Sequence, residues 1–237
     1  DPNIQNNYGK TALMKATPTG EENVKLLLKN GADPNIRDMH GVTALDTPVL
    51  REDIEVVRLL LENNADPNIK GIDDDTPLVY ASSSGYTDIV QLLLENDADP
   101  DIRGVDGDTA LIRASTSGDT EIVRLLLDRG ADPNIQSDVG GNTALIIASK
   151  GGEESIDDTD IVKLLLENGA DTNIIDKYGR TALQTAKHWE HIKIEKLLER
   201  YIRLSRTQKA YQQLKASRLS VDYDVSRMIG ERLNKMP

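Results

Sequence analysis

The chain has 237 residues, with 28 Lys or Arg against 40 Asp or Glu, which gives a net charge of −12. Cysteine is absent, so disulfides, thiol nucleophiles and cysteine metal sites are excluded. Phenylalanine is also absent and only seven Tyr and one Trp remain, so we expect a core of Leu, Ile, Val and Ala in thin layers.

From the N-terminus onward, the first element that recurs is the block Ala-Asp-Pro-Asn-Ile. It occurs at 32–36, 65–69 and 131–135, with variants at 98–102 and 170–174, and its first four alanines are 33 residues apart. A Thr-Ala-Leu or Thr-Pro-Leu block and a run of leucines recur at a similar interval. Such a period predicts a stack of repeated units rather than one globular core.

The Thr block predicts the first helix of each unit. A Thr hydroxyl can accept hydrogen bonds from the free backbone N–H groups at a helix start. Pro77, in the Thr-Pro-Leu version, suits the first helical position because it has no N–H. The block begins at Thr11, Thr43, Thr76, Thr109, Thr143 and Thr181.

A second helix with an apolar stripe follows in each unit, and its pattern is clear at 122–127, Ile-Val-Arg-Leu-Leu-Leu. Each of these helices is predicted to end at a residue type that tolerates the left-handed backbone conformation. These residues are Gly31, Asn64, Asp97, Gly130 and Gly169. The segment after them is rich in Asp, Asn and Gly, and it predicts a β-turn finger that leads to the next Thr.

Together these motifs resemble those of the ankyrin-repeat family. The resemblance covers residues 1–202 and is close throughout 107–132, where Gly-Asp-Thr-Ala-Leu, Gly118 and a Leu-rich helix follow one another. It implies an all-α repeat solenoid of six stacked ankyrin helix pairs with β-turn fingers, in which the fingers and first helices form a concave groove. Helices this short are unstable alone in water, so the units must stack.

Among several departures from the pattern, two lie between the Thr block and the second helix of a unit. In the second unit Pro48 replaces the alanine of other units, and Glu52 replaces a glycine. Proline removes a backbone donor, so we expect an irregular first helix at Thr47–Arg51. The fifth unit has five extra residues in Gly151–Asp160, which we expect to form an acidic loop.

The end of the sequence differs in charge from the rest. Residues 203–237 hold 8 Lys or Arg and 3 Asp or Glu, a net charge of +5, which leaves 20 and 37 and a net charge of −17 in residues 1–202. Apolar residues follow helical spacing at Val225, Met228, Ile229, Leu233 and Met236. We therefore expect a repeat domain at 1–202, whose first unit begins within a finger, and a basic amphipathic helical tail at 203–237. The tail is expected to cap the last unit; docking on a partner or an anionic surface is the alternative.

No catalytic, cofactor or metal motif can be identified, so we expect no enzyme activity from these residues and no cofactor. His40, His188 and His191 are the three histidines, and no carboxylate-rich zinc pattern surrounds them. The run at 73–75 lacks the spaced ligands of a calcium loop and is interpreted as a solvated turn. The acidic repeats repel phosphate, which disfavours nucleic acid.

The fingers predict a partner-binding surface. When the fingers are aligned by their repeated Asp, apolar residues share one position and acidic residues are frequent at the neighbouring positions. Adjacent fingers are therefore expected to present a row of exposed apolar side chains flanked by acidic ones. The predicted surface consists of Met39, His40, Ile72, Asp73, Asp75, Val105, Asp106, Asp108 and Val139. A protein segment with basic and apolar residues would complement it. The alternative is that the acidic finger tips only keep the protein soluble.

The sequence therefore predicts a non-enzymatic protein–protein interaction module. Neither a signal peptide nor an apolar run of the roughly 20 residues that span a membrane is seen, so we expect it in the cytoplasm or nucleus. The alternative is the targeting or substrate-recognition part of a larger effector or enzyme whose catalytic domain lies outside the fragment, because residues 1–4 correspond to the interior of a finger. A structural spacer without a partner is a third possibility.

Overall fold

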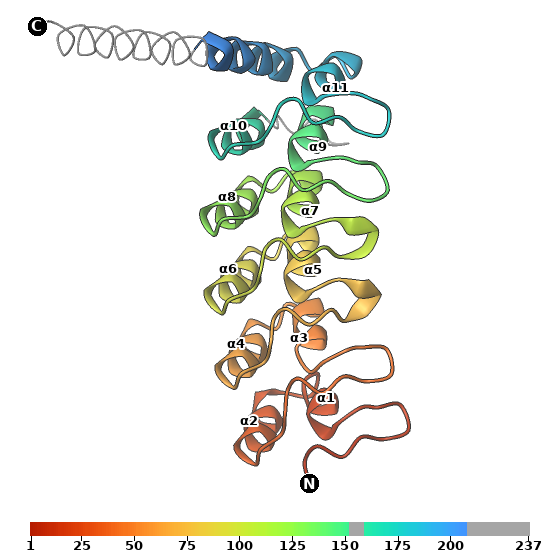
Figure 1. Cartoon of the computed structure of the whole chain (residues 1–237). Helices are drawn as coiled ribbons and strands as arrows, with labels where there is room; N and C mark the ends of the chain where they lie inside the picture. The colour runs from red at the N-terminus through yellow and green to blue at the C-terminus, as the bar shows by residue number, and fades with distance from the viewer. Residues whose placement is uncertain (152–158, 208–237) are drawn as a thin grey trace, which may run out of the picture.

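The computed structural model describes residues 1–151 and 159–207, which form six stacked helix pairs (Figure 1). The first helices of the pairs are α1 (Ala12–Ala16), α3 (Asp46–Leu50), α5 (Pro77–Ser84), α7 (Ala110–Ser117), α9 (Ala144–Lys150) and α11 (Ala182–His188). The second helices are α2 (Glu21–Lys29), α4 (Ile54–Glu62), α6 (Thr87–Glu95), α8 (Thr120–Asp128) and α10 (Thr159–Glu167), and a last helix, here called the terminal helix, covers 192–207. Within these ranges all regular structure is helical. The predicted solenoid is confirmed.

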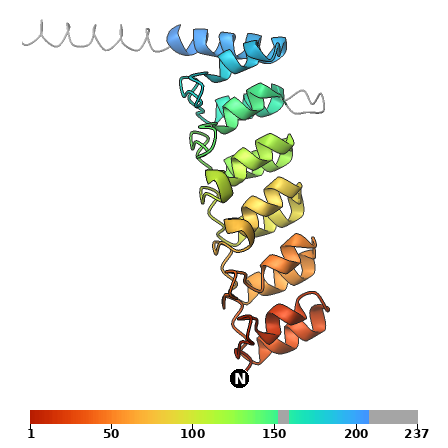
Figure 2. The same ribbon diagram turned by 90° about the vertical axis from the view of Figure 1, so that its right-hand side faces the viewer.

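The helices form two columns, one of first helices and one of second helices. Helices α5, α7, α9 and α11 pack in sequence, as do α4, α6, α8 and α10. The fingers project beside the column of first helices, at the right of Figure 1, and a view turned by 90° shows the same regular layering (Figure 2). Each unit therefore contributes one finger and one first helix to the same side of the stack.

One continuous hydrophobic core runs between the two columns. Its buried apolar residues are Leu, Ile, Val and Ala, with the addition of Met14. In the fourth unit Leu111, Ile122 and Leu126 are at most 1% exposed. Fully burying such a side chain is worth about 1.5–3 kcal/mol, so short helices that are unstable alone become stable in the stack.

Thr residues cap the first helices as predicted, with one exception. The hydroxyls of Thr11, Thr76, Thr109, Thr143 and Thr181 each accept the backbone N–H of the residue three positions later, at 3.3–3.4 Å. In the second unit Thr43 instead donates its hydroxyl to the Asp46 carboxylate at 2.8 Å.

The second unit is irregular where Pro48 was expected to disturb it. Helix α3 begins at Asp46, three residues after Thr43, whereas α7 begins directly after Thr109. The late start places Pro48 in the first turn, where a backbone N–H has no intrahelical partner. Glu52 then takes a left-handed conformation, with φ 57°, at the position that Gly85 and Gly118 occupy in the third and fourth units.

Asparagine side chains connect successive units at the base of the fingers. Asn68 Nδ2 donates to the carbonyl of Asp97 at 3.1 Å, and its Oδ1 accepts the N–H of Asp99 at 2.8 Å. Asn35 and Asn134 make the same pair of bonds to the units that follow them. These repeated bonds fix the fingers in register along the stack.

Two segments discussed from the sequence lie mostly outside the described residues. The acidic loop of the fifth unit lies mostly in 152–158, and the tail expected as a cap lies mostly in 208–237. The terminal helix crosses the expected boundary between residues 202 and 203 without interruption.

Candidate interaction surface

The finger tips are shaped by local hydrogen bonds, in two different ways. Each finger is numbered with the first helix that follows it, so residues 1–10 form the first finger. In the second finger Asp38 Oδ1 accepts the N–H groups of His40 and Val42 at 2.8 and 3.0 Å, and in the sixth Asp176 Oδ1 accepts those of Tyr178 and Arg180. The third and fourth fingers have Gly71 and Gly104 at this position and form single 3-10 turns, η1 (Ile72–Asp74) and η2 (Val105–Gly107).

The two glycines leave room for a carboxylate from the preceding unit. A Cβ atom at Gly71 would clash with Asp46 Oδ1, and one at Gly104 would clash with Asp75 Oδ1. Asp75 Oδ1 accepts the N–H of Val105 at 2.8 Å. An acidic residue of one unit thus holds the finger of the next.

Three of the four residues of the predicted apolar row are exposed. Met39, Val105 and Val139 are 63%, 36% and 60% exposed. Ile72 differs, because it is half-buried and lines a small hollow with Asp46 and Tyr80. His40 is exposed on the finger of Met39.

The four predicted acids divide into two kinds. Asp73 and Asp106 are exposed at the finger tips, with left-handed φ of 55° and 60°, and no described residue forms an ion pair with them. Asp75 and Asp108 are half-buried; Asp108 lies 3.2 Å from Arg113 Nε.

Burial raises the pKa of both half-buried acids. It raises the pKa of Asp75 despite the opposing Val105 hydrogen bond and the Arg113 charge, and it raises the pKa of Asp108 despite Arg113. The carboxylates of Asp73 and Asp106 are therefore the more accessible to a partner. Those of Asp75 and Asp108 are engaged in contacts within the stack.

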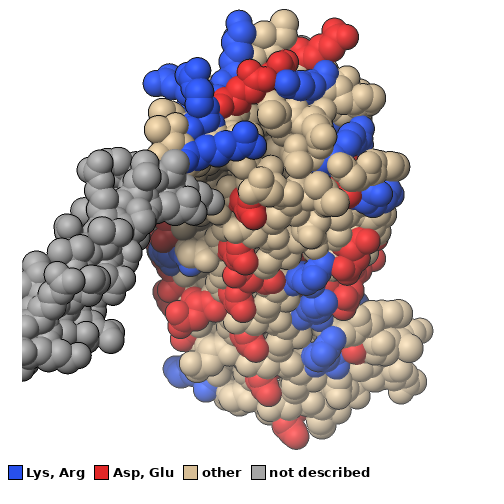
Figure 3. Space-filling view, turned by 45° about the horizontal axis from the view of Figure 1, so that its top comes forward, with Lys and Arg blue, Asp and Glu red and all other residues tan. Residues whose placement is uncertain are grey.

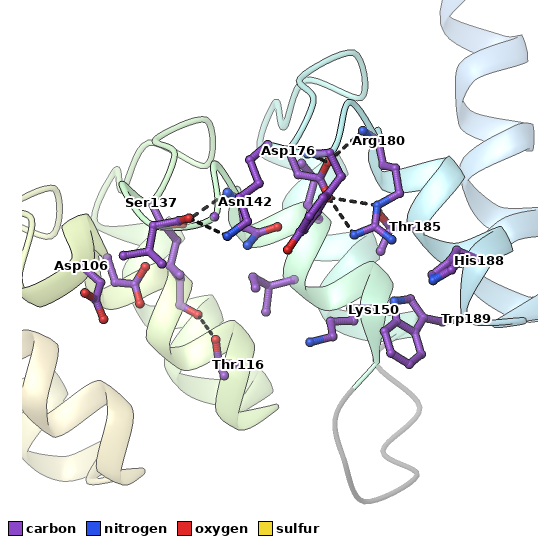
Figure 4. A pocket seen from close by; sticks show the side chains of 18 residues that line it. Asp106, Thr116, Ser137, Asn142, Lys150, Asp176, Arg180, Thr185, His188 and Trp189 are labelled. Atoms are coloured by element: carbon purple, nitrogen blue, oxygen red, sulfur yellow. Dashed lines mark hydrogen bonds and ion pairs between the residues drawn. The ribbon is translucent and has the colours of Figure 1, made fainter.

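A groove of about 770 Å³ runs across the fourth, fifth and sixth units (Figure 4). Fingers form one wall, and α7, α9 and α11 form the floor. The predicted residues Asp106, Asp108 and Val139 line it, whereas Met39, His40, Ile72, Asp73 and Asp75 do not. The groove is also lined by Ile147 and Lys150 of α9, by Tyr178 and Arg180 of the sixth finger, and by Trp189.

The floor is apolar in its middle, on α9, and aromatic with basic neighbours at the end formed by the sixth unit. Ile147 is half-buried on α9, and Trp189, at the end of α11, is 48% exposed. Lys150 Nζ lies 5.5 Å from the centre of the Trp189 ring, and Arg180 lies 4.9 Å from the centre of the Tyr178 ring. Figure 4 shows Lys150 beside Trp189 at the sixth-unit end, with Asp106 at the opposite end.

The aromatic end was not predicted from the sequence. Tyr178 occupies the same finger slot as His40, and Trp189 ends a first helix, so aligning the fingers and first helices together would have identified both. Among the residues that the structure describes, no group of three or more His, Cys, Asp or Glu is arranged to hold a metal ion. Nor is any described helix long and apolar enough to cross a bilayer.

Comparison with known proteins agrees with this architecture. A sequence model described as "Ankyrin repeats (3 copies)" matches residues 1–71, 69–137 and 131–208. The solved structure of EF0377, an ankyrin repeat protein, is 35% identical with a TM-score of 0.74, over 83% of this chain and 100% of that one. An ankyrin repeat domain from Acinetobacter baumannii is 35% identical with a TM-score of 0.75, over 80% and 96% of the two chains.

Two further proteins are similar over less of their length. The ankyrin repeat domain of Bcl-3, described as a unique member of the IkappaB protein family, is 32% identical with a TM-score of 0.68, over 78% of this chain and 82% of that one. A curated ankyrin repeat protein, L86 of Acanthamoeba polyphaga mimivirus, is 54% identical over 48 residues. That match covers 18% of this chain and 8% of the viral protein.

Proposed function

Because this chain belongs to the ankyrin-repeat family, whose repeats are in general protein–protein interaction modules, we propose that it is a non-enzymatic module that binds a partner protein through its fingers and first helices. The observation that carries the proposal is the groove across units four to six, with its half-buried apolar floor at Ile147 and its exposed aromatic end at Trp189. Aromatic and apolar side chains of this kind supply most of the binding energy at protein interfaces.

The partner is a protein segment with apolar and basic side chains. Its apolar residues contact Val139, Ile147 and Tyr178. Its Lys or Arg residues face the exposed carboxylates of Asp106, which lines the groove, and of Asp73 on the neighbouring finger. The carboxylates act mainly on the rate of association and on partner choice, whereas the apolar floor sets the lifetime of the complex.

Affinity capture from cell lysate followed by binding measurements with the purified partner tests this proposal. The first variant is Ile147→Lys, which is compatible with the fold because the equivalent slots of other units hold Lys15 and Arg113. We expect it to weaken binding at least about tenfold, or roughly 1.4 kcal/mol. The second variant, Asp73→Ser with Asp106→Ser, is expected to slow association and to reduce its dependence on salt.

A matched control for the second variant removes the same number of acidic residues at positions outside the fingers. Asp88→Ser with Asp128→Ser alters two exposed acids on α6 and α8 and is expected to bind like the wild type. The proposal fails if Ile147→Lys remains folded by circular dichroism and still binds with unchanged affinity.

A second candidate function is recognition on behalf of a longer protein that also carries a catalytic domain. The mimivirus relative is much longer than the matched 48 residues, which are 8% of its length, so a protein with such repeats has room for a further domain. Recovery of the full reading frame tests this candidate, since a catalytic domain beside the repeats supports it and a frame of repeats alone contradicts it.

A further inference from the structure

The terminal helix presents basic side chains to solvent along one side. Five of them are exposed and lie three or four positions apart, which places them on neighbouring turns of one face. They are Lys193, Lys196, Arg200, Arg203 and Arg206, here called the basic stripe. The opposite face packs on the stack through Ile194 and Leu198, which are 4% and 0% exposed.

The acidic residues of the same helix pair with a lysine of α11. Glu195 and Glu199 are the two acids within 192–207, and Lys187 of α11 pairs with both, at 3.7 and 2.8 Å. No described residue forms an ion pair with Lys196, Arg200, Arg203 or Arg206. Four guanidinium or ammonium groups are therefore available to an outside anion.

The location of the basic stripe is unusual within an acidic molecule. Residues 1–202 carry a net charge of −17, yet several Lys and Arg side chains lie at the end of the stack where the terminal helix is, at the top of Figure 3, with acidic side chains between them. Exposed charges are screened over about 8 Å at physiological salt, so the stripe attracts anions locally although the whole chain repels them.

We propose that the basic stripe is a second binding surface and that its ligand is an acidic segment of a partner protein. Successive cations rise about 4.5–6 Å along the helix. Carboxylates spaced three or four residues apart on a partner helix match this rise, and the Arg side chains can bind them in bidentate fashion.

Exposed apolar side chains near both ends of the stripe favour a protein ligand over a nucleic acid or a lipid headgroup. Ile192 and Leu204 are 60% and 56% exposed. A protein segment can contact both with apolar side chains, whereas a phosphate backbone cannot. A long polyanion would also extend over the acidic repeats, while a short acidic segment is confined to the end of the stack.

Fluorescence anisotropy with the full chain tests the assignment. The probe is a labelled synthetic peptide that carries Glu at every third or fourth position and two Leu. We expect salt-dependent binding that Lys196→Glu with Arg200→Glu and Arg203→Glu weakens more than tenfold. The control is Lys29→Glu with Arg51→Glu and Arg58→Glu, which changes the net charge equally at exposed positions of the first two units and is expected to bind the peptide within about twofold of the wild type.

Three results would overturn the proposal. The first is the absence of peptide binding, and the second is an equal loss in both triple variants, which would indicate a response to net charge alone. The third is tighter binding of a 20-base-pair RNA duplex, or of phosphatidylserine vesicles, than of the peptide at the same salt concentration. Because the basic stripe lies outside the groove, each of these results leaves the proposed function of the fingers unaffected.

Discussion

Asp46 shows how one residue can depart from a repeat and still be accommodated. Other units place Met14, Val79, Ile112 or Ile146 in its slot. Asp46 is 6% exposed; its Oδ2 accepts the backbone N–H of Thr43 at 2.7 Å, and the carboxylate also accepts the N–H of Ile72 in the next finger. Burial nevertheless outweighs these bonds and raises the pKa of Asp46 above the ordinary value of an aspartate.

The raised pKa predicts a specific dependence of stability on pH. A carboxyl group with a higher pKa in the folded state binds protons more tightly there, so the folded protein loses stability as pH rises from about 4 through the raised pKa. Asp46→Asn does not titrate at this position. We therefore expect the unfolding free energy of the wild type, minus that of Asp46→Asn, to fall between pH 4 and pH 7. Urea unfolding at the two pH values measures it, and a difference that rises with pH would contradict the assignment of the pKa.

At the scale of elements, the asparagine links between units differ in one place. Asp101 occupies the slot of Asn35, Asn68 and Asn134. Its Oδ1 still accepts the N–H of Asp132 at 2.9 Å, but a carboxylate has no N–H to donate to the carbonyl of the following unit. Burial raises the pKa of Asp101, and the nearby charges of Asp99 and Asp132 raise it further.

Restoring the amide is expected to strengthen this link. Asp101→Asn supplies the missing donor and removes a repelled charge, so we expect the unfolding free energy to increase by about 0.5–1.5 kcal/mol. Urea unfolding at pH 7 measures the change. Asp128→Asn, which removes an exposed charge on α8, serves as the control and is expected to change stability by less than about 0.5 kcal/mol. Lower stability of Asp101→Asn would show that the link depends on the carboxylate.

Elements governed by nearby residues were predictable from the sequence, whereas contacts between units were not. Capping by Thr109 depends on a residue three positions away, and the irregular α3 follows from Pro48 itself. The half-burial of Asp75 depends on the space that Gly104 leaves in the next finger. The aromatic residues of the groove stand out when the repeats are aligned, but the approach of Lys150 to Trp189 depends on how α11 stacks on α9.

At the scale of the whole molecule, stability depends on position along the stack. Helix α8 packs against α6, α7 and α10, whereas α2, in the first unit, packs against α1 and α4. In a linear array each unit is stabilised by its neighbours, so an internal unit has two interfaces and a terminal unit has one.

Matching core substitutions should reveal this difference. Leu126→Ala in α8 removes a side chain that is 0% exposed and is expected to cost about 3–5 kcal/mol. Leu28→Ala in α2 removes one that is 9% exposed at the edge and is expected to cost about 2 kcal/mol or less. Urea unfolding followed by circular dichroism compares the two, and equal losses would indicate that the array unfolds without regard to position.

The single tryptophan of the chain has an optical consequence. Trp189 lies at the edge of the groove, next to the ring of His188 and half exposed to water, and no other indole contributes to the emission. Excitation at the red edge of the indole band therefore observes this one location. A molecule that enters the groove would shift the emission toward the blue by excluding water, so the unmodified protein can serve as its own sensor when candidate ligands are screened.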